Sequence, residues 1–193
     1  MHKILEADKH LFTIINGQWH NRFLDWIMPY MRQSEVWIPL YLFLLVFVLL
    51  NVKKSGWFIL LCICGVALTD ILSSNIIKEK IGIFRLRPCH DPEVAQYIRF
   101  LVSYCPQSSS FTSSHAANHF FLAVFLSISL KPLVGRWIYI SYFWAFIIAY
   151  AQVYVGVHFP IDVFCGALVG CLTGTIMGKF YSKKAGNLVL ANN

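Results

Sequence analysis

Long runs of apolar residues divide the chain into five stretches separated by shorter polar segments. These runs lie at residues 36–52, 57–77, 116–130, 137–155 and 161–180. A helix needs about 20 mostly apolar residues to cross the hydrocarbon core of a bilayer. The runs are close to that length, although the third is short unless its polar start is counted. The pattern predicts an all-α protein, a polytopic transmembrane helix bundle of five to six spans.

The N-terminal region has a weaker pattern. Residues 3–16 place a stripe of apolar side chains at helical spacing, formed by Ile4, Leu5, Leu11, Phe12 and Ile15. Such a stripe beside charged residues is typical of a helix in the membrane interface. Residues 22–31 are apolar but too few to span alone, so they indicate a re-entrant or interfacial piece, or else a sixth, polar span. We expect an interfacial or re-entrant segment over 1–34 and the helix bundle over 35–193.

Composition supports a membrane protein. Hydrophobic residues make up 58% of the chain and charged residues 13%, whereas soluble domains are about a quarter charged. The formal net charge is +7, but the basic residues are scattered or lie at the ends of the predicted spans. Membrane topology produces that distribution. We therefore expect membrane lipids as partners and no nucleic acid.

One long polar connection, at residues 78–114, joins the second and third runs. Loops of this length are often functional. The third and fourth runs cross the membrane and return, so the end of the fourth run lies on the same side as the loop. The number of membrane crossings alone thus brings Lys80, Arg87, His115 and His158 to one membrane face.

The opposite face is basic and carries no Asp or Glu. Its basic residues are Lys53, Lys54, Lys131, Arg136, Lys179, Lys183 and Lys184. The positive-inside rule makes this face cytoplasmic. We therefore expect an integral protein of a bacterial inner membrane with its active site facing the periplasm.

The cysteines and carboxylates do not predict a metal site. Cys89 and Cys105 both lie in the long loop, where an oxidising compartment would allow a disulfide. Two free thiols are the alternative. The cysteine spacing is unlike that of a zinc site, and no cluster of carboxylates suits magnesium.

The loop begins with two cations, Lys80 and Arg87, separated by six residues. A phosphate monoester carries up to two negative charges. Lys offers a point charge, and Arg offers a planar fork that binds two oxygens. The alternative is a cluster that sets topology or binds lipid headgroups.

The loop ends in a hydroxyl-rich turn that leads into the third run, with Ser113, Ser114 and His115 in sequence. Backbone N–H groups at a helix N-terminus bind anions, and a His at that place can protonate a leaving oxygen. A capping turn with an incidental His is the alternative.

A third motif runs from Gln152 to Asp162, with His158 at the end of the fourth run. A carboxylate four residues after His158 can hold one ring nitrogen and fix the tautomer, which leaves the other nitrogen to attack. A structural hydrogen bond at a helix junction is the alternative.

In this order, the three motifs resemble those of the type 2 phosphatidic acid phosphatase superfamily, which is related to the vanadium haloperoxidases. The resemblance covers about residues 80–162. It implies that Lys80 and Arg87 bind the phosphoryl oxygens, helped by the backbone N–H groups of Ser113 and Ser114.

The resemblance also implies the catalytic roles. His158 would attack phosphorus and form a phosphohistidine, and Asp162 would orient His158. His115 would protonate the leaving alcohol and then activate water. The family needs no metal and no other cofactor.

Two positions depart from the family pattern. Ser114 replaces a Gly of the second motif, and Gln152 replaces an Arg of the third. Gln152 can bind substrate by hydrogen bonding but has no charge. Removing one charged donor from a site that stabilises a transition state raises the activation free energy by about 3 kcal/mol, which lowers the rate about a hundredfold. Arg85 and Arg99 are candidates to compensate, and Gln152→Arg is expected to raise activity.

The sequence therefore predicts a membrane lipid phosphatase. Its substrate would be a phosphate monoester or diphosphate of a polyprenyl lipid, a glycerophospholipid or lipid A. One alternative is a lipid phosphotransferase that uses the same site. Another, supported by Gln152, is a catalytically weak relative that binds lipids.

Overall fold

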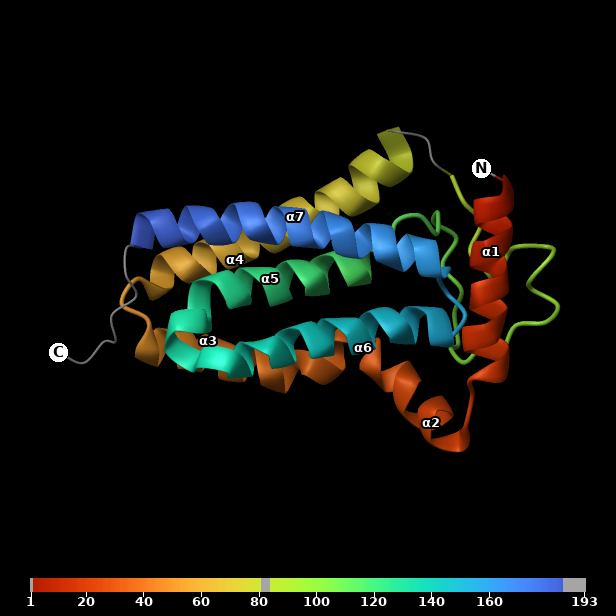
Figure 1. The fold of residues 1–193 in the computed structure, drawn as a ribbon, viewed down its shortest axis with the longest axis horizontal. Coiled ribbons are helices and arrows are strands. Elements are labelled where there is room, and N and C mark those ends of the chain that lie inside the picture. The colour runs from red at the N-terminus through yellow and green to blue at the C-terminus, as the bar shows by residue number, and fades with distance from the viewer. Residues whose placement is uncertain (1, 81–83, 186–193) are drawn as a thin grey trace.

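The computed structural model describes residues 2–80 and 84–185, with side chains for 3–77 and 84–184. Throughout these ranges the regular structure is helical, and no strand occurs. The elements are α1 (His2–Thr13), η1 (Ile14–Gln18), α2 (Arg22–Met31), η2 (Ser34–Trp37), α3 (Ile38–Asn51), α4 (Ser55–Asp70), η3 (Ile71–Lys80), α5 (Ser114–Val134), η4 (Gly135–Tyr139), α6 (Ile140–Tyr154) and α7 (Pro160–Ala185) (Figure 1).

Within the described residues, the membrane-spanning part consists of five long helices. Four helical stretches of this part are long and apolar enough to cross a bilayer: Ser34–Asn51, Ser55–Ile77, Ser114–Tyr154 and Pro160–Lys184. The third stretch turns back at η4, so that α5 and α6 lie antiparallel (Figure 1). Large apolar side chains such as Leu50 and Phe143 point outward, with 70% and 64% exposure, as lipid-facing residues do. The predicted all-α membrane bundle is confirmed.

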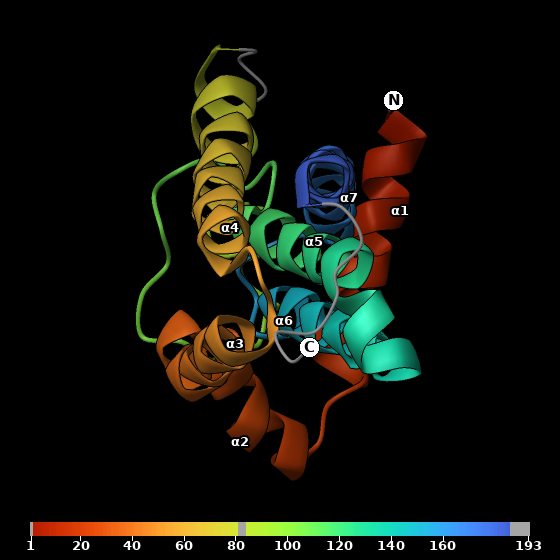
Figure 2. The ribbon, with the colours of Figure 1, turned by 90° about the vertical axis from the view of Figure 1, so that its left-hand side faces the viewer.

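Helix α5 lies at the centre of the bundle. Looking along the bundle, α4, α6 and α7 surround α5 (Figure 2). The most extensive contact is with α7, where glycines allow the two backbones to approach closely. A side chain at Gly166 would collide with the carbonyl oxygen of Ser113, and one at Gly170 with that of Ala117. The pair α5–α7 is therefore a fixed support for the residues at its end.

The N-terminal segment closes one end of the bundle. Helix α1 lies across the direction of the long helices, beside the loop (Figure 1). The predicted apolar stripe is divided between two environments. Phe12 is fully buried against Phe159, with ring centroids 5.2 Å apart, whereas Ile4 is 62% exposed. One side of α1 therefore faces the protein, where Asp8 and Phe12 are buried, and the other side is exposed.

The basic face predicted from the sequence lies at the opposite end. The α3–α4 connection, the α5–η4 turn and the end of α7 meet at the end of the bundle farthest from α1 (Figure 1). Lys54 Nζ donates a hydrogen bond to the carbonyl oxygen of Lys184 (3.0 Å). The long loop and the α6–α7 junction therefore share the other end, as the parity of the spans predicts.

Candidate active site

Arg87 is a buried cation held by neutral acceptors. Its Nε donates to the carbonyl oxygen of Ser108 (3.0 Å), its Nη2 to Ser108 Oγ (3.1 Å) and its Nη1 to the carbonyl oxygen of Val157 (3.0 Å). Nη1 also lies 3.0 Å from Nε2 of His158. Burial lowers the pKa of Arg87 to about 10, while Asp162 raises it and Arg32 lowers it. Arg87 therefore stays charged at neutral pH, directly beside the predicted nucleophile.

The hydroxyl of a serine links the side chains of His158 and Asp162. Nδ1 of His158 lies 3.8 Å from Oδ2 of Asp162, which is too far for the direct hydrogen bond expected from the sequence. Ser110 Oγ lies between them, 2.5 Å from Oδ2 and 3.3 Å from Nδ1. The hydroxyl proton goes to the carboxylate, so the serine oxygen accepts from Nδ1–H. The unprotonated nitrogen of His158 is then Nε2, on the side of Arg87.

Helix α1 contributes a second carboxylate that the motifs did not reveal. Asp8 Oδ2 pairs with Arg85 Nη2 (2.6 Å), and Arg85 Nη1 donates to Asp162 Oδ1 (2.9 Å). Asp8 Oδ1 accepts from the N–H of Ile161 at the start of α7 (2.9 Å). Burial raises the pKa of Asp8, and the hydrogen bonds from Ile161 and Arg85 oppose this. Two carboxylates thus hold Arg85, whose charge orients Asp162 and is not directed at a phosphate.

Replacing Asp8 with Asn is expected to destabilise this arrangement. The amide keeps an acceptor for Ile161 but removes a buried negative charge, and breaking a buried pair costs about 3 kcal/mol. The midpoint of thermal unfolding in detergent should fall by several degrees. Lys3→Gln, on the exposed side of the same helix, is the matched control. Equal midpoints for Asp8→Asn and Lys3→Gln would contradict the role given to Asp8.

Ser113 has a structural role at the start of α5. Its N–H donates to the carbonyl oxygen of Asp162 (3.0 Å), and its Oγ accepts from the N–H of Ala116 (3.4 Å) as a helix cap. The Ser113 N–H is therefore engaged within the protein, contrary to its predicted part in phosphate binding. The Ser114 N–H has no hydrogen-bond partner among the described residues, so its part in phosphate binding stays a prediction.

His115 lies in the first turn of α5 and lines a pocket of about 410 Å³ between α3, α4 and α5. The other lining residues are Ser34, Tyr41, Val66, Asp70, Ser114, Asn118, His119 and Leu122. The charges of Arg32, His158 and Arg87 all act on His115. The predicted acid is therefore near the predicted nucleophile, at a pocket that reaches into the membrane part of the bundle.

The remaining predicted residues have different outcomes. The side chain of Lys80, at the end of η3, lies outside the described residues, so its role stays a prediction. Gln152 is fully buried, and its carbonyl oxygen accepts from the N–H of His158 (3.2 Å). Its Oε1 accepts from Nε of Arg32 (3.5 Å). Arg99, a candidate to compensate for Gln152, instead pairs with Asp25 (2.5 Å).

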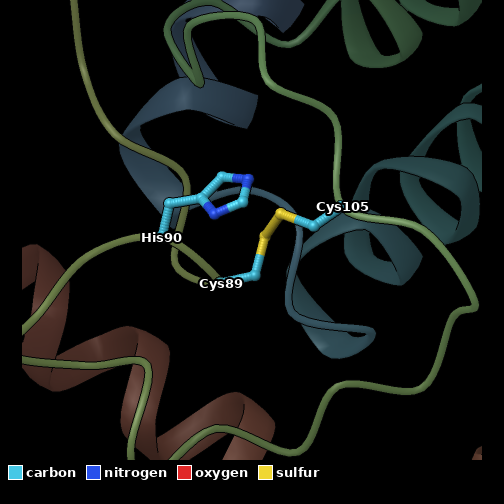
Figure 3. A group of neighbouring side chains, drawn as sticks. All are labelled: Cys89, His90 and Cys105. Carbon is cyan, nitrogen blue, oxygen red and sulfur yellow. A yellow bond between two sulfur atoms is a disulfide. The ribbon is translucent and has the colours of Figure 1, made fainter.

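Cys89 and Cys105 form a disulfide in the loop, with Cα atoms 6.4 Å apart (Figure 3). His90 lies beside them, and the three side chains are close enough to share a metal ion. Their sulfurs are bonded to each other, so the thiolates that such a site needs are not available. Cys89 lies two residues after Arg87, and Cys105 three before Ser108. The disulfide therefore joins the two sides of the loop next to the contact between Arg87 and Ser108.

Removing the disulfide is expected to weaken the Arg87 site. In the chain-entropy account, a closed loop of this size stabilises a fold by about 3 kcal/mol. Cys89→Ser with Cys105→Ser should lower both the thermal midpoint and the rate of phosphate release several-fold. Reductant should do the same to the unmodified protein. Cys64→Ser, at a free cysteine, is the control. Full activity of the double variant would show that the disulfide does not stabilise the Arg87 site.

Comparisons with known proteins identify relatives of this chain. Residues 56–185 match the sequence model of the PAP2 superfamily. A lipid A 4′-phosphatase of Bacteroides thetaiotaomicron is 32% identical over 177 residues, which cover 88% of this chain and 74% of that protein. A second, from Porphyromonas gingivalis, is 28% identical over 185 residues, which cover 94% and 75%.

Two crystal structures have the same fold. LpxE of Aquifex aeolicus superposes with a TM-score of 0.68 at 30% identity, over 88% of this chain and 93% of that one. A PAP2-type phosphatidylglycerolphosphate phosphatase of Bacillus subtilis gives 0.66 at 22% identity, over 97% and 90%. The helix bundle, the three motifs and the matched family model together show that the chain is an integral membrane protein of the PAP2 superfamily.

Proposed function

We propose that this protein is a membrane lipid phosphatase that removes a phosphate from lipid A. The observation that carries the proposal is the arrangement around His158. Nδ1 of His158 faces Asp162 through Ser110, and Nε2 lies 3.0 Å from Arg87. A ring nitrogen with a fixed tautomer beside a fixed guanidinium is suited to attack a phosphoryl group. The lipid A 4′-phosphatase relatives and the likeness to LpxE support lipid A as the substrate.

The first step transfers the phosphoryl group to the protein. Nε2 of His158 attacks phosphorus and a P–N bond forms, while the bond from phosphorus to the sugar oxygen breaks. His115 gives its proton to the departing oxygen, which leaves as an alcohol. Arg87 and the Ser114 N–H stabilise the charge on the phosphoryl oxygens. Asp162, through Ser110, stabilises the positive ring of His158.

The second step regenerates the protein. His115, now neutral, takes a proton from a water molecule, and the resulting oxygen attacks phosphorus. The P–N bond breaks, inorganic phosphate leaves, and His158 returns to its starting tautomer. One group thus acts first as acid and then as base.

The location of the site fits a substrate held in one leaflet. The pocket at His115 lies between membrane helices, while Arg87 and His158 lie at the end opposite the basic face. The positive-inside rule makes the basic face cytoplasmic. We infer that the protein resides in a bacterial inner membrane and acts on the outer leaflet, from the periplasmic side.

Phosphate release by the purified protein tests this proposal. The substrates are lipid A with both phosphates, phosphatidylglycerophosphate, phosphatidic acid and undecaprenyl diphosphate, each with EDTA. Mass spectrometry should show lipid A losing one phosphate, with inorganic phosphate appearing in equal amount. Preferred hydrolysis of another lipid would refute the substrate. Phosphate appearing on a second lipid instead of in solution would show a phosphotransferase.

A further inference from the structure

Arg32 reaches the active site from the N-terminal segment. It follows α2, which packs against α6, and its Nε donates to Oε1 of Gln152 (3.5 Å). Gln152 stands where the family has an arginine, two residues before the end of α6. A guanidinium from elsewhere in the chain therefore contacts the side chain at the position where the family has an arginine. The two residues are separated by 120 positions in the sequence.

The electrostatics around Arg32 indicate an anion site. Burial lowers the pKa of Arg32, and Glu35 opposes that shift from a distance. The charge of Arg32 acts unfavourably on Arg87. Within the described part of the chain, neither Arg32 nor Arg87 forms an ion pair with a carboxylate. Like charges that interact in a partly buried place are costly unless an anion binds between them.

The other arginines near the site differ in this respect. Arg85 is paired with Asp8 and Asp162, and Arg99 with Asp25. Their charges are already balanced within the protein. They are therefore poor candidates to replace the family arginine, contrary to the expectation from the sequence.

Gln152 supports the same conclusion. Its Oε1 holds Nε of Arg32, which leaves the two terminal nitrogens of that guanidinium to bind two oxygens. Its Nε2 is buried and has no hydrogen-bond partner among the described residues. A buried donor without a partner is costly, and a phosphoryl oxygen between Arg32 and Gln152 would satisfy it.

We propose that Arg32 binds the phosphoryl group during its transfer to His158 and supplies the positive charge that Gln152 lacks. The inference rests on the proposed phosphatase function and adds a binding residue to it. It also changes the expectation for Gln152→Arg. A second guanidinium beside Arg32 would repel it, so this variant should lose activity rather than gain it.

Exchanging the two side chains tests the proposal in the full-length protein. Arg32→Gln should lower kcat/KM for lipid A about a hundredfold, the effect of removing one charged donor from such a site. Combining Arg32→Gln with Gln152→Arg returns the charge to the family position. The double variant should recover at least about tenfold over Arg32→Gln. Arg22→Gln, an exposed arginine on α2, should behave like the unmodified protein.

Inhibition by orthovanadate, an analogue of the phosphoryl group, gives a second readout. Arg32→Gln should weaken it by about tenfold or more, and the double variant should restore it. If the Arg32→Gln variant does not fold, the Arg32→Met variant, which keeps the apolar stem of the side chain, is used in both assays instead. Unchanged kcat/KM and unchanged vanadate inhibition in the variant that folds would overturn the role of Arg32. Failure of the unmodified protein to release phosphate from any lipid would instead overturn the proposed function.

Discussion

His158→Ala is expected to abolish phosphate release from lipid A, with kcat falling about 10⁴-fold or more. Removing a nucleophile eliminates the covalent step, and losses of this order or greater are typical. The substitution leaves Arg87 and Asp162 in place, so substrate binding should change far less than kcat. The measurement is phosphate release in detergent, with enough enzyme to detect a ten-thousandth of the normal rate.

The control for this variant is His20→Ala, which removes an exposed imidazole outside the site. Its kcat should equal that of the unmodified protein. A residual rate above about one hundredth in His158→Ala would mean that another group attacks phosphorus. The attacking group would then be His115 or an activated water molecule.

Arg87→Lys is expected to lower kcat/KM by about 10²- to 10³-fold, although the charge is kept. The planar fork of Arg87 binds Ser108 and Val157 while Nη1 faces His158. An ammonium group cannot satisfy those acceptors and hold a phosphoryl oxygen at the same time. The loss resembles that of one preorganised charged donor, with an added contribution from the disturbed loop.

Arg136→Lys is the matched control, because Arg136 is exposed in η4 on the basic face. It should have no effect on phosphate release. A loss of less than about threefold in Arg87→Lys would show that charge alone suffices at this position. The fork geometry seen in the structure would then be irrelevant to catalysis.

Much of the fold could be predicted because the membrane imposes simple rules. Apolar runs set the helices, and the parity of the spans brought Arg87, His115 and His158 to one end without any side-chain geometry. The ordered motifs then identified the family. These signals are local in the sequence or depend only on counting passes, so tertiary packing could not overturn them.

The parts of the site that were missed come from tertiary packing. Ser110 belongs to a run of three serines in the long loop, and only the folded loop places it between His158 and Asp162. Asp8 and Arg32 come from the N-terminal segment, whose pattern indicated only an interfacial position. Their roles depend on α1 and α2 closing over the end of the bundle, which no spacing in the sequence encodes.

Rapid-quench labelling tests the central claim, phosphoryl transfer to His158, most directly. The protein is mixed with lipid A carrying radiolabelled phosphate, stopped within milliseconds to seconds, and digested to find the label. We predict label on the peptide containing His158, released by acid and stable to alkali, and absent from His158→Ala. Label on any other residue, or turnover without protein-bound label at every quench time, would contradict the account.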